Sequence, residues 1–167
     1  MMSAMKLEET QDYDAEPDRV YAMLCDQAWR EEVCRATHAI DYAVTVEESG
    51  DTVTVRTTRV LPAQVPQAVK AMVGDTLEIV QTETWTAGPG GDGTRRADVD
   101  LQVSKQPASM TGTITLEPRG SGTRRTVVGD IRVRIPLLGR RIEPEIAKAI
   151  RTALDKEQES AHTYLAG

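Results

Sequence analysis

The feature that most constrains the fold of this chain is an amphipathic segment at residues 141–165. At 100° per residue, its apolar side chains fall on one stripe and its charged side chains on the opposite side. A helix of this length extends about 36 Å at ~1.5 Å per residue, which is enough to cross a small sheet. The stripe consists of Ile142, Ile146, Ala149, Ile150, Ala153, Ala161 and Tyr164. We therefore predict a long C-terminal helix with one buried face.

Before this segment, apolar and polar residues alternate with a period of two, which is the pattern of half-buried β-strands. Gly112 and Gly129 fall on the inward-facing set of the last two strands, where a missing side chain lets a sheet bend. The predicted strands are residues 6–13, 40–47, 53–59, 76–86, 95–104, 109–118 and 123–135. We predict an α+β fold in which a curved antiparallel sheet of about seven strands wraps around the C-terminal helix.

Two short helices are predicted after the first strand. Pro17 fits the first turn of a helix, where a missing backbone N–H is tolerated. Asp26 can cap a second short helix, which carries Trp29 and Val33. A third short helix, at residues 65–73, interrupts the series of strands.

Composition is that of one globular domain, which we place at residues 5–166. The 167 residues are 40% hydrophobic and 28% charged, and Phe is absent, so aliphatic side chains must build most of the interior. No apolar run reaches the roughly 18 residues that span a bilayer, and no signal-peptide pattern opens the chain. We expect a cytoplasmic protein without a transmembrane segment. Transient contact with a membrane is compatible with this expectation. The oligomeric state is not indicated.

Charge argues against nucleic-acid binding, because the net charge is -6 and phosphate neutralisation needs a clustered basic face. The distribution is uneven, since basic residues outnumber acidic ones only in the second half of the chain. A local basic patch is one interpretation, and a solvated, charge-balanced face of the sheet is the alternative. The residues of this basic segment are Arg124, Arg125, Arg132, Arg134, Arg140 and Arg141.

No cofactor and no metal site are expected. Cys25 and Cys34 lack the spacing of a zinc site, and we interpret them as reduced, partly buried thiols. His38 and His162 are isolated from residues that would make them catalytic, so we assign no catalytic residue.

Polar residues on the predicted inner faces are candidates for orienting a ligand. Arg59 follows Val53 and Val55 on one inward face, and Glu157 lies near the centre of the helical stripe. A buried charge needs a partner, so Arg59 paired with Glu83 or Glu157 could anchor a polar head group. The alternative is that these long side chains lie near the ends of their elements and reach water.

The candidate ligand-binding residues are Tyr42, Val44, Val55, Thr57, Arg59, Gln81, Glu83, Trp85, Ala149, Ala153 and Glu157. Residues Val65, Val69 and Met72 of the third short helix could form a lid over the ligand, although simple packing at the sheet edge is equally open.

The order of these elements resembles the helix-grip fold of the START/Bet v 1-like (SRPBCC) superfamily. Residues 14–26, with the pattern Pro-x-x-Val-aromatic-x-x-Leu-x-Asp, are similar to the opening of these domains, and residues 136–143 are similar to the entry into their last helix. Residues 73–77 and 81–85 resemble an uncharacterised bacterial branch, known only as a domain of unknown function. The resemblance covers roughly residues 5–165.

The resemblance implies a cavity between sheet and helix that holds an apolar or amphipathic small molecule, such as a lipid, an isoprenoid or a polyketide-like compound. The superfamily also includes polyketide cyclases, which suggests an enzyme using Glu83, Glu157 or His38 as general acid or base. An interaction protein without a ligand is the third hypothesis.

Overall fold

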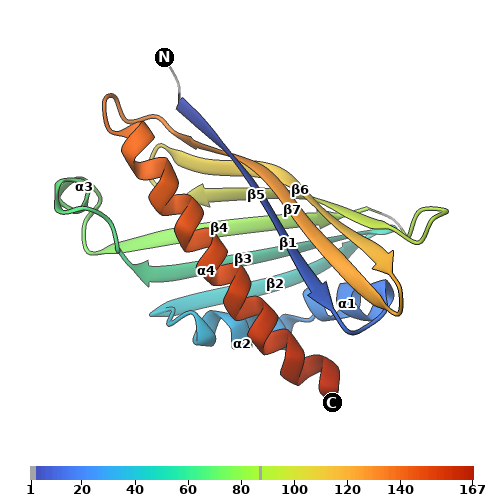
Figure 1. Cartoon of the computed structure of the whole chain (residues 1–167). Helices are drawn as coiled ribbons and strands as arrows, with labels where there is room; N and C mark the ends of the chain where they lie inside the picture. Colours follow the sequence, from blue (N-terminus) through green and yellow to red (C-terminus); the bar gives the residue numbers. More distant parts are fainter. Residues whose placement is uncertain (1–2, 87) are drawn as a thin grey trace.

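The computed structural model describes residues 3–86 and 88–167, in which seven strands form one antiparallel sheet (Figure 1). Its spatial order is β1-β7-β6-β5-β4-β3-β2, so β2 to β7 pair in sequence order and β1 joins the sheet beside β7. The predicted strands are confirmed. Their bounds are β1 (Ser3–Tyr13), β2 (Asp41–Ser49), β3 (Thr52–Pro62), β4 (Thr76–Trp85), β5 (Arg95–Val103), β6 (Ala108–Arg119) and β7 (Gly122–Val133).

The helices are α1 (Pro17–Leu24), α2 (Gln27–Ala36), α3 (Gln67–Val73) and α4 (Gly139–Ala166). Asp26 caps α2 as predicted, because its carboxylate accepts hydrogen bonds from the backbone N–H groups of Ala28 and Trp29, at 2.9 and 3.3 Å. The helix α3 begins two residues later than predicted. Pro66 restricts the backbone of Val65 to extended conformations, which keeps that residue outside the helix.

The sheet bends where two glycines face each other across β6 and β7. Gly112 pairs with Gly129 in the strand register, and both belong to the inward-facing set. A Cβ atom at Gly112 would lie 1.9 Å from the carbonyl oxygen of Val128, far inside contact distance. The close approach of the two backbones therefore requires glycine, as the sequence pattern indicated.

Helix α4 crosses the concave side of the sheet and packs most closely against β1 and β7, with α2 touching its C-terminal half (Figure 1). Helices α1 and α2 close one end of the concave side. The main core joins the sheet to α1, α2 and α4 through Leu7, Val20, Met23, Leu24, Trp29, Trp85, Ile114, Leu116, Ile131, Ala147 and Leu154. A smaller cluster of Val69, Val133 and Ile142 fixes α3 to β7 and to the start of α4.

The predicted inward stripe of α4 is wrong at two positions, because Ala149 and Tyr164 are exposed. The fully buried row runs through Ala147, Leu154 and Ala161, seven residues apart. Ala149 lies about 200° around the helix from Ala147, which turns it toward solvent. Tyr164 is also largely at the surface, where its hydroxyl donates a hydrogen bond to Asp26 at 2.8 Å.

The glycine pair gives a direct test of this curvature. We expect Gly112→Ala to lower the free energy of unfolding by about 3 kcal/mol, because the added methyl group collides with backbone atoms. The control is Gly91→Ala in the β4–β5 loop, where an added Cβ meets nothing within 4 Å. Urea denaturation of both variants measures the difference. Equal stability of the two variants would contradict the close approach of β6 and β7.

Candidate functional site

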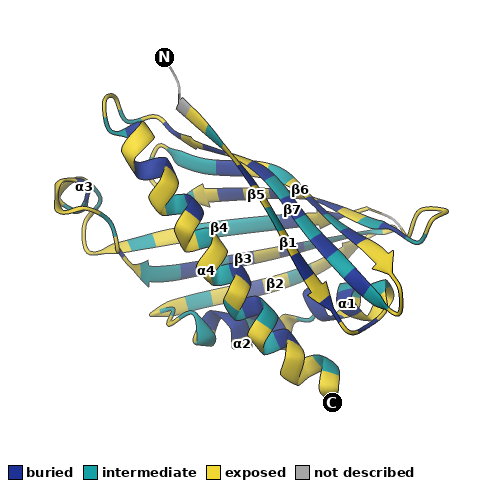
Figure 2. Ribbon diagram, in the orientation of Figure 1, coloured by how far each residue is buried: buried dark blue, intermediate teal, exposed yellow. Residues whose placement is uncertain are grey.

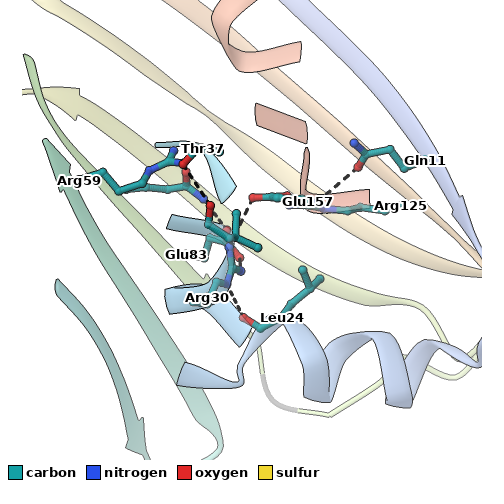
Figure 3. A network of polar contacts seen from close by, with 10 residues as sticks. Gln11, Leu24, Arg30, Thr37, Arg59, Glu83, Arg125 and Glu157 are labelled. Carbon is teal, nitrogen blue, oxygen red and sulfur yellow. Dashed lines mark hydrogen bonds and ion pairs between the residues drawn. The ribbon is translucent and has the colours of Figure 1, made fainter. Parts of the chain in front are cut away.

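The interior contains a network of buried charged side chains from four different elements (Figure 3). Arg30 of α2 donates a hydrogen bond to Glu83 of β4 at 2.6 Å, and Arg125 of β7 donates one to Glu157 of α4 at 2.5 Å. The two pairs are connected, since a guanidinium nitrogen of Arg30 lies 3.8 Å from the second carboxylate oxygen of Glu157. We call these four residues the ion network.

Neutral groups add hydrogen bonds to the ion network, although the buried Nε of Arg125 has no acceptor within the described residues. Arg30 donates from Nε to the carbonyl oxygen of Leu24 at 2.7 Å, and Gln81 donates to the second oxygen of Glu83 at 2.6 Å. Arg125 reaches Gln11 of β1 at 3.4 Å. Buried ions are tolerated when pairing and hydrogen bonding are combined in this way.

Glu157 is held in its ionised form. Burial opposes ionisation, but the charges of Arg125 and Arg30 outweigh burial and hold the pKa of this carboxyl below its ordinary value. The same contact with Glu157 raises the pKa of Arg125, against the effect of its own burial. An ionised carboxylate locked between two guanidinium groups suits a structural anchor better than a proton donor.

Arg59 does not pair as predicted. It is buried on the inner face of β3, and the only hydrogen bond of its side chain within the described residues goes from Nη1 to the hydroxyl of Thr37 at 3.3 Å. The predicted partners, Glu83 and Glu157, instead pair with Arg30 and Arg125. The alternative that these charged groups reach water is also wrong, because Arg59, Glu83 and Glu157 are 8%, 1% and 6% exposed.

Arg30 and Arg125 were missed as site residues although the sequence carried a signal for each. Arg30 precedes Val33 and Cys34 by three and four residues, which places it on the buried face of α2. Arg125 shares its alternation with Val127 of the same strand, which places it inside the sheet. Arg125 is therefore not part of a surface basic patch, and the half-buried Arg124 forms an ion pair with Asp12 at 2.8 Å.

The strand register brings the predicted ligand-binding residues of the sheet onto one inner surface. Arg59 lies opposite Tyr42 on one side and Ile79 on the other, and Thr57 lies opposite Val44 and Gln81. Val55 pairs with Glu83 in the same way, and Trp85 closes the row as a fully buried residue. On α4, Ala153 is half-buried one turn before Glu157, whereas the exposed Ala149 lies outside this surface.

Burial of the inner surface falls from one end of β4 to the other (Figure 2). Glu83 and Trp85 are buried at the end covered by α1 and α2, whereas Gln81 and Ile79 are only half-buried. On α4, Ile146, Ile150 and Ala153 are half-buried and share the helical face of Glu157. We call Ile79, Gln81, Ile146, Ile150 and Ala153 the inner strip.

The two sides of the inner strip, on β4 and on α4, are connected indirectly at two junctions. At one end Arg30 bridges Glu83 and Glu157, and at the other end α3, which precedes β4, contacts Ile142. From Glu83 back to the start of β4 is about 23 Å, and from Glu157 back to Ile142 is also about 23 Å. Between these two junctions α4 passes over the sheet at an angle to β4 (Figure 1).

A surface hollow of about 270 Å³ lies elsewhere, at the loops beside the N-terminus of α1. It is lined by residues such as Glu16, Pro17 and Pro118, and it contains none of the predicted ligand-binding residues.

Of the residues considered for catalysis, Glu83 and Glu157 are bridged by Arg30, and His38 lies outside the ion network. His38 is exposed at the junction between α2 and β2, where it adopts a left-handed backbone with φ 61°. Cys25 and Cys34 are free thiols, as predicted, and burial raises the pKa of Cys25 to about 11. A protonated thiol is a weak nucleophile.

A curved seven-stranded sheet around a long C-terminal helix, with two short helices after the first strand, is the helix-grip fold of the START/Bet v 1-like superfamily. The chain belongs to the family described as protein of unknown function (DUF2505), whose model matches residues 8–165.

Several solved structures share this fold. A STAR-related lipid transfer protein from Xanthomonas axonopodis has 14% identity and a TM-score of 0.61, covering 91% of this chain and 82% of that chain. Ara h 8.0201 has 12% identity and a TM-score of 0.59, covering 96% and 99%. Norcoclaurine synthase from Thalictrum flavum, a point mutant with a transition state analogue, has 10% identity and a TM-score of 0.57, covering 98% of both chains.

No curated protein matches the sequence. Across the described residues, none of the helices combines the length and apolarity that crossing a bilayer requires.

The ion network can be tested through its dependence on pH. We expect Glu157→Gln to lower the free energy of unfolding by about 3–5 kcal/mol near neutral pH, because Arg125 loses its buried partner. The folded pKa of Glu157 lies below its unfolded value, so its stabilisation is complete above that value and is lost as pH falls toward the folded pKa. The difference from the wild type should narrow as pH falls below about 4.5.

Urea denaturation across a pH series measures this difference. The exposed Glu159 of the same helix provides the control, because Glu159→Gln removes a charge only from a surface pair with Lys156. A Glu157→Gln deficit that stays constant into acid would contradict a charge-based role for Glu157.

Proposed function

We propose that this protein binds an apolar or amphipathic small molecule, such as a lipid, an isoprenoid or a polyketide-like compound, between β4 and α4, along the inner strip. The observation that carries this proposal is the fall in burial along β4. Side chains that face the interior are normally buried when the layers of a domain pack directly on each other. Here Ile79 and Ile150 face the interior and keep solvent exposure, although both pack against the core.

The position of α4 gives the physical reason for this exposure. The helix packs closely on β1 and β7, at one edge of the sheet, and is attached to β4 through the long side chain of Arg30. A long connecting side chain leaves the backbones of β4 and α4 farther apart than direct apolar packing would. A flat or elongated apolar molecule placed between them would cover the exposed parts of Ile79, Ile146 and Ile150.

The fold supports the same proposal by analogy. A protein with this fold is described by its name as a lipid transfer protein, and another was solved with a transition state analogue. Shared fold alone does not transfer an activity, so the proposal depends on the inner strip.

We propose that α3 acts as a lid at the less buried end of the inner strip. Val69 is its only buried residue and packs on Val133 and Ile142, whereas Val65 is half-buried and Met72 is 59% exposed. An element with few buried contacts opens at low free-energy cost. Hydrogen exchange at the amides of Gln67–Val73 should slow when the probe described next is added, and unchanged exchange would contradict the lid.

The proposed function is tested with N-phenyl-1-naphthylamine, a neutral apolar probe that fluoresces when it leaves water. We expect the wild-type protein to bind it and Ile150→Glu to weaken binding by about tenfold or more, since a charge would enter the apolar strip. The matched control is Ala149→Glu, which adds the same charge one residue earlier, on the solvent side of α4. It should bind like the wild type.

Two results would contradict the proposal. One is the absence of probe binding to folded wild-type protein, and the other is equal loss of binding in the two α4 variants. Native mass spectrometry of protein purified under mild conditions should also show a bound mass in the hundreds of daltons.

A further inference from the structure

Among the described residues, Arg59 is the one buried guanidinium of the inner surface without a carboxylate partner. It is 8% exposed, and no carboxylate of the described residues lies within 4 Å of its nitrogen atoms. Its Nε–H has no hydrogen-bond acceptor within the same residues, and the only hydrogen bond of its side chain is the long one to Thr37. A buried charge left in this state is costly for the folded protein.

The other two buried arginines cannot take its place. Arg30 is occupied by Glu83 and by the carbonyl oxygen of Leu24, and Arg125 is occupied by Glu157. Glu157 attracts Arg59 from a distance, as its lowered pKa records, but does not contact it. The three buried arginines of this region therefore outnumber its two buried carboxylates, Glu83 and Glu157.

Glu143, the remaining buried charged residue in the described part of the chain, lies away from the carboxylate of Glu157. It lies near the start of α4, 14 residues before Glu157, which is about 21 Å along the helix. Within the described residues, Arg59 therefore keeps a buried positive charge that no ion pair neutralises.

Arg59 also stands beside the inner strip. Its Cα partner on β4 is Ile79, a member of the strip, and residues directly opposite in antiparallel strands project to the same side. On the other side its partner is Tyr42, which is half-buried. A molecule lying along Ile79 would therefore have one end within reach of the free guanidinium.

We propose that the ligand of the inner strip is an amphipathic carboxylic acid whose carboxylate is bound by Arg59, an inference that rests on the proposed function. A guanidinium offers parallel N–H groups that match the two oxygens of a carboxylate, and a monoanion neutralises the single excess positive charge. The Nε–H of Arg59 gains its missing acceptor, and the aliphatic part of the ligand covers Ile79 and Ile150.

The test compares two molecules that differ only in their head group. Decanoate and decan-1-ol have the same chain length, and decanoic acid is ionised near neutral pH. Both are titrated against N-phenyl-1-naphthylamine bound to the wild-type protein. We expect decanoate to displace the probe at a concentration about tenfold or more below that of decan-1-ol, as a charged hydrogen bond would give.

Three variants locate the preference. Arg59→Gln should reduce the preference for decanoate to about twofold or less, and Arg59→Lys should retain part of it. The control is Arg56→Gln, which removes an exposed arginine from the opposite face of the same strand and should leave the preference unchanged. Equal displacement by both molecules, or equal loss of preference in Arg56→Gln, would overturn the assignment of a carboxylate to Arg59.

The outcomes separate the two proposals. If the probe fails to bind, the proposed function fails. If the probe binds and decanoate has no advantage, only the carboxylate fails and an apolar ligand stands.

The melting temperature of the protein without added ligand gives a second, independent test of the role of Arg59. Because Arg59 is an unpaired charge in the empty protein, Arg59→Met should melt at or above the wild-type temperature. Arg125→Met, which leaves Glu157 without its closest partner, should melt well below it. A comparable loss of melting temperature in both variants would show that Arg59 has a structural role and would overturn the inference.

Discussion

The contact between Arg30 and the two buried carboxylates determines how the rest of this structure is arranged. It connects α2, β4 and α4, and Arg125 extends the connection to β7. Buried ion pairs contribute little net stability compared with apolar packing, but removing one partner is strongly destabilising. The ion network therefore fixes where α4 stands above the sheet, because any displacement of the helix would separate Glu157 from both arginines.

The fixed position of α4 above the sheet explains why the interior has both a closed core and a partly exposed inner strip. Apolar side chains and the ion network fill the end near α1 and α2, where Trp85 and Glu83 are fully buried. Toward α3, α4 follows β1 and β7, and the inward residues of β4 are left partly uncovered. The free charge of Arg59 lies at this boundary, which joins an apolar surface to a cationic group in the way that an amphipathic acid requires.

Most of the fold could be predicted from sequence, because alternation in strands such as β7 and the helical period of α4 are local signals. The pairing of buried charges could not. Arg30 lies among charged neighbours on α2, and Arg125 follows Arg124 on β7, so both look like surface residues until the position of the partner is known. The predicted burial of Ala149 was wrong for a related reason. The side of α4 that is buried depends on its contacts with β1 and β7 and not on the helix alone.

The most direct test of this account is a crystal structure of the protein grown with decanoate. The account predicts electron density between β4 and α4, with the carboxylate on Arg59, the chain along Ile79 and Ile150, and the pairs of Arg30 with Glu83 and Arg125 with Glu157 unchanged. A structure in which α4 lies directly on β3 to β5, with the inner strip filled by side chains and no density beside Arg59, would contradict it.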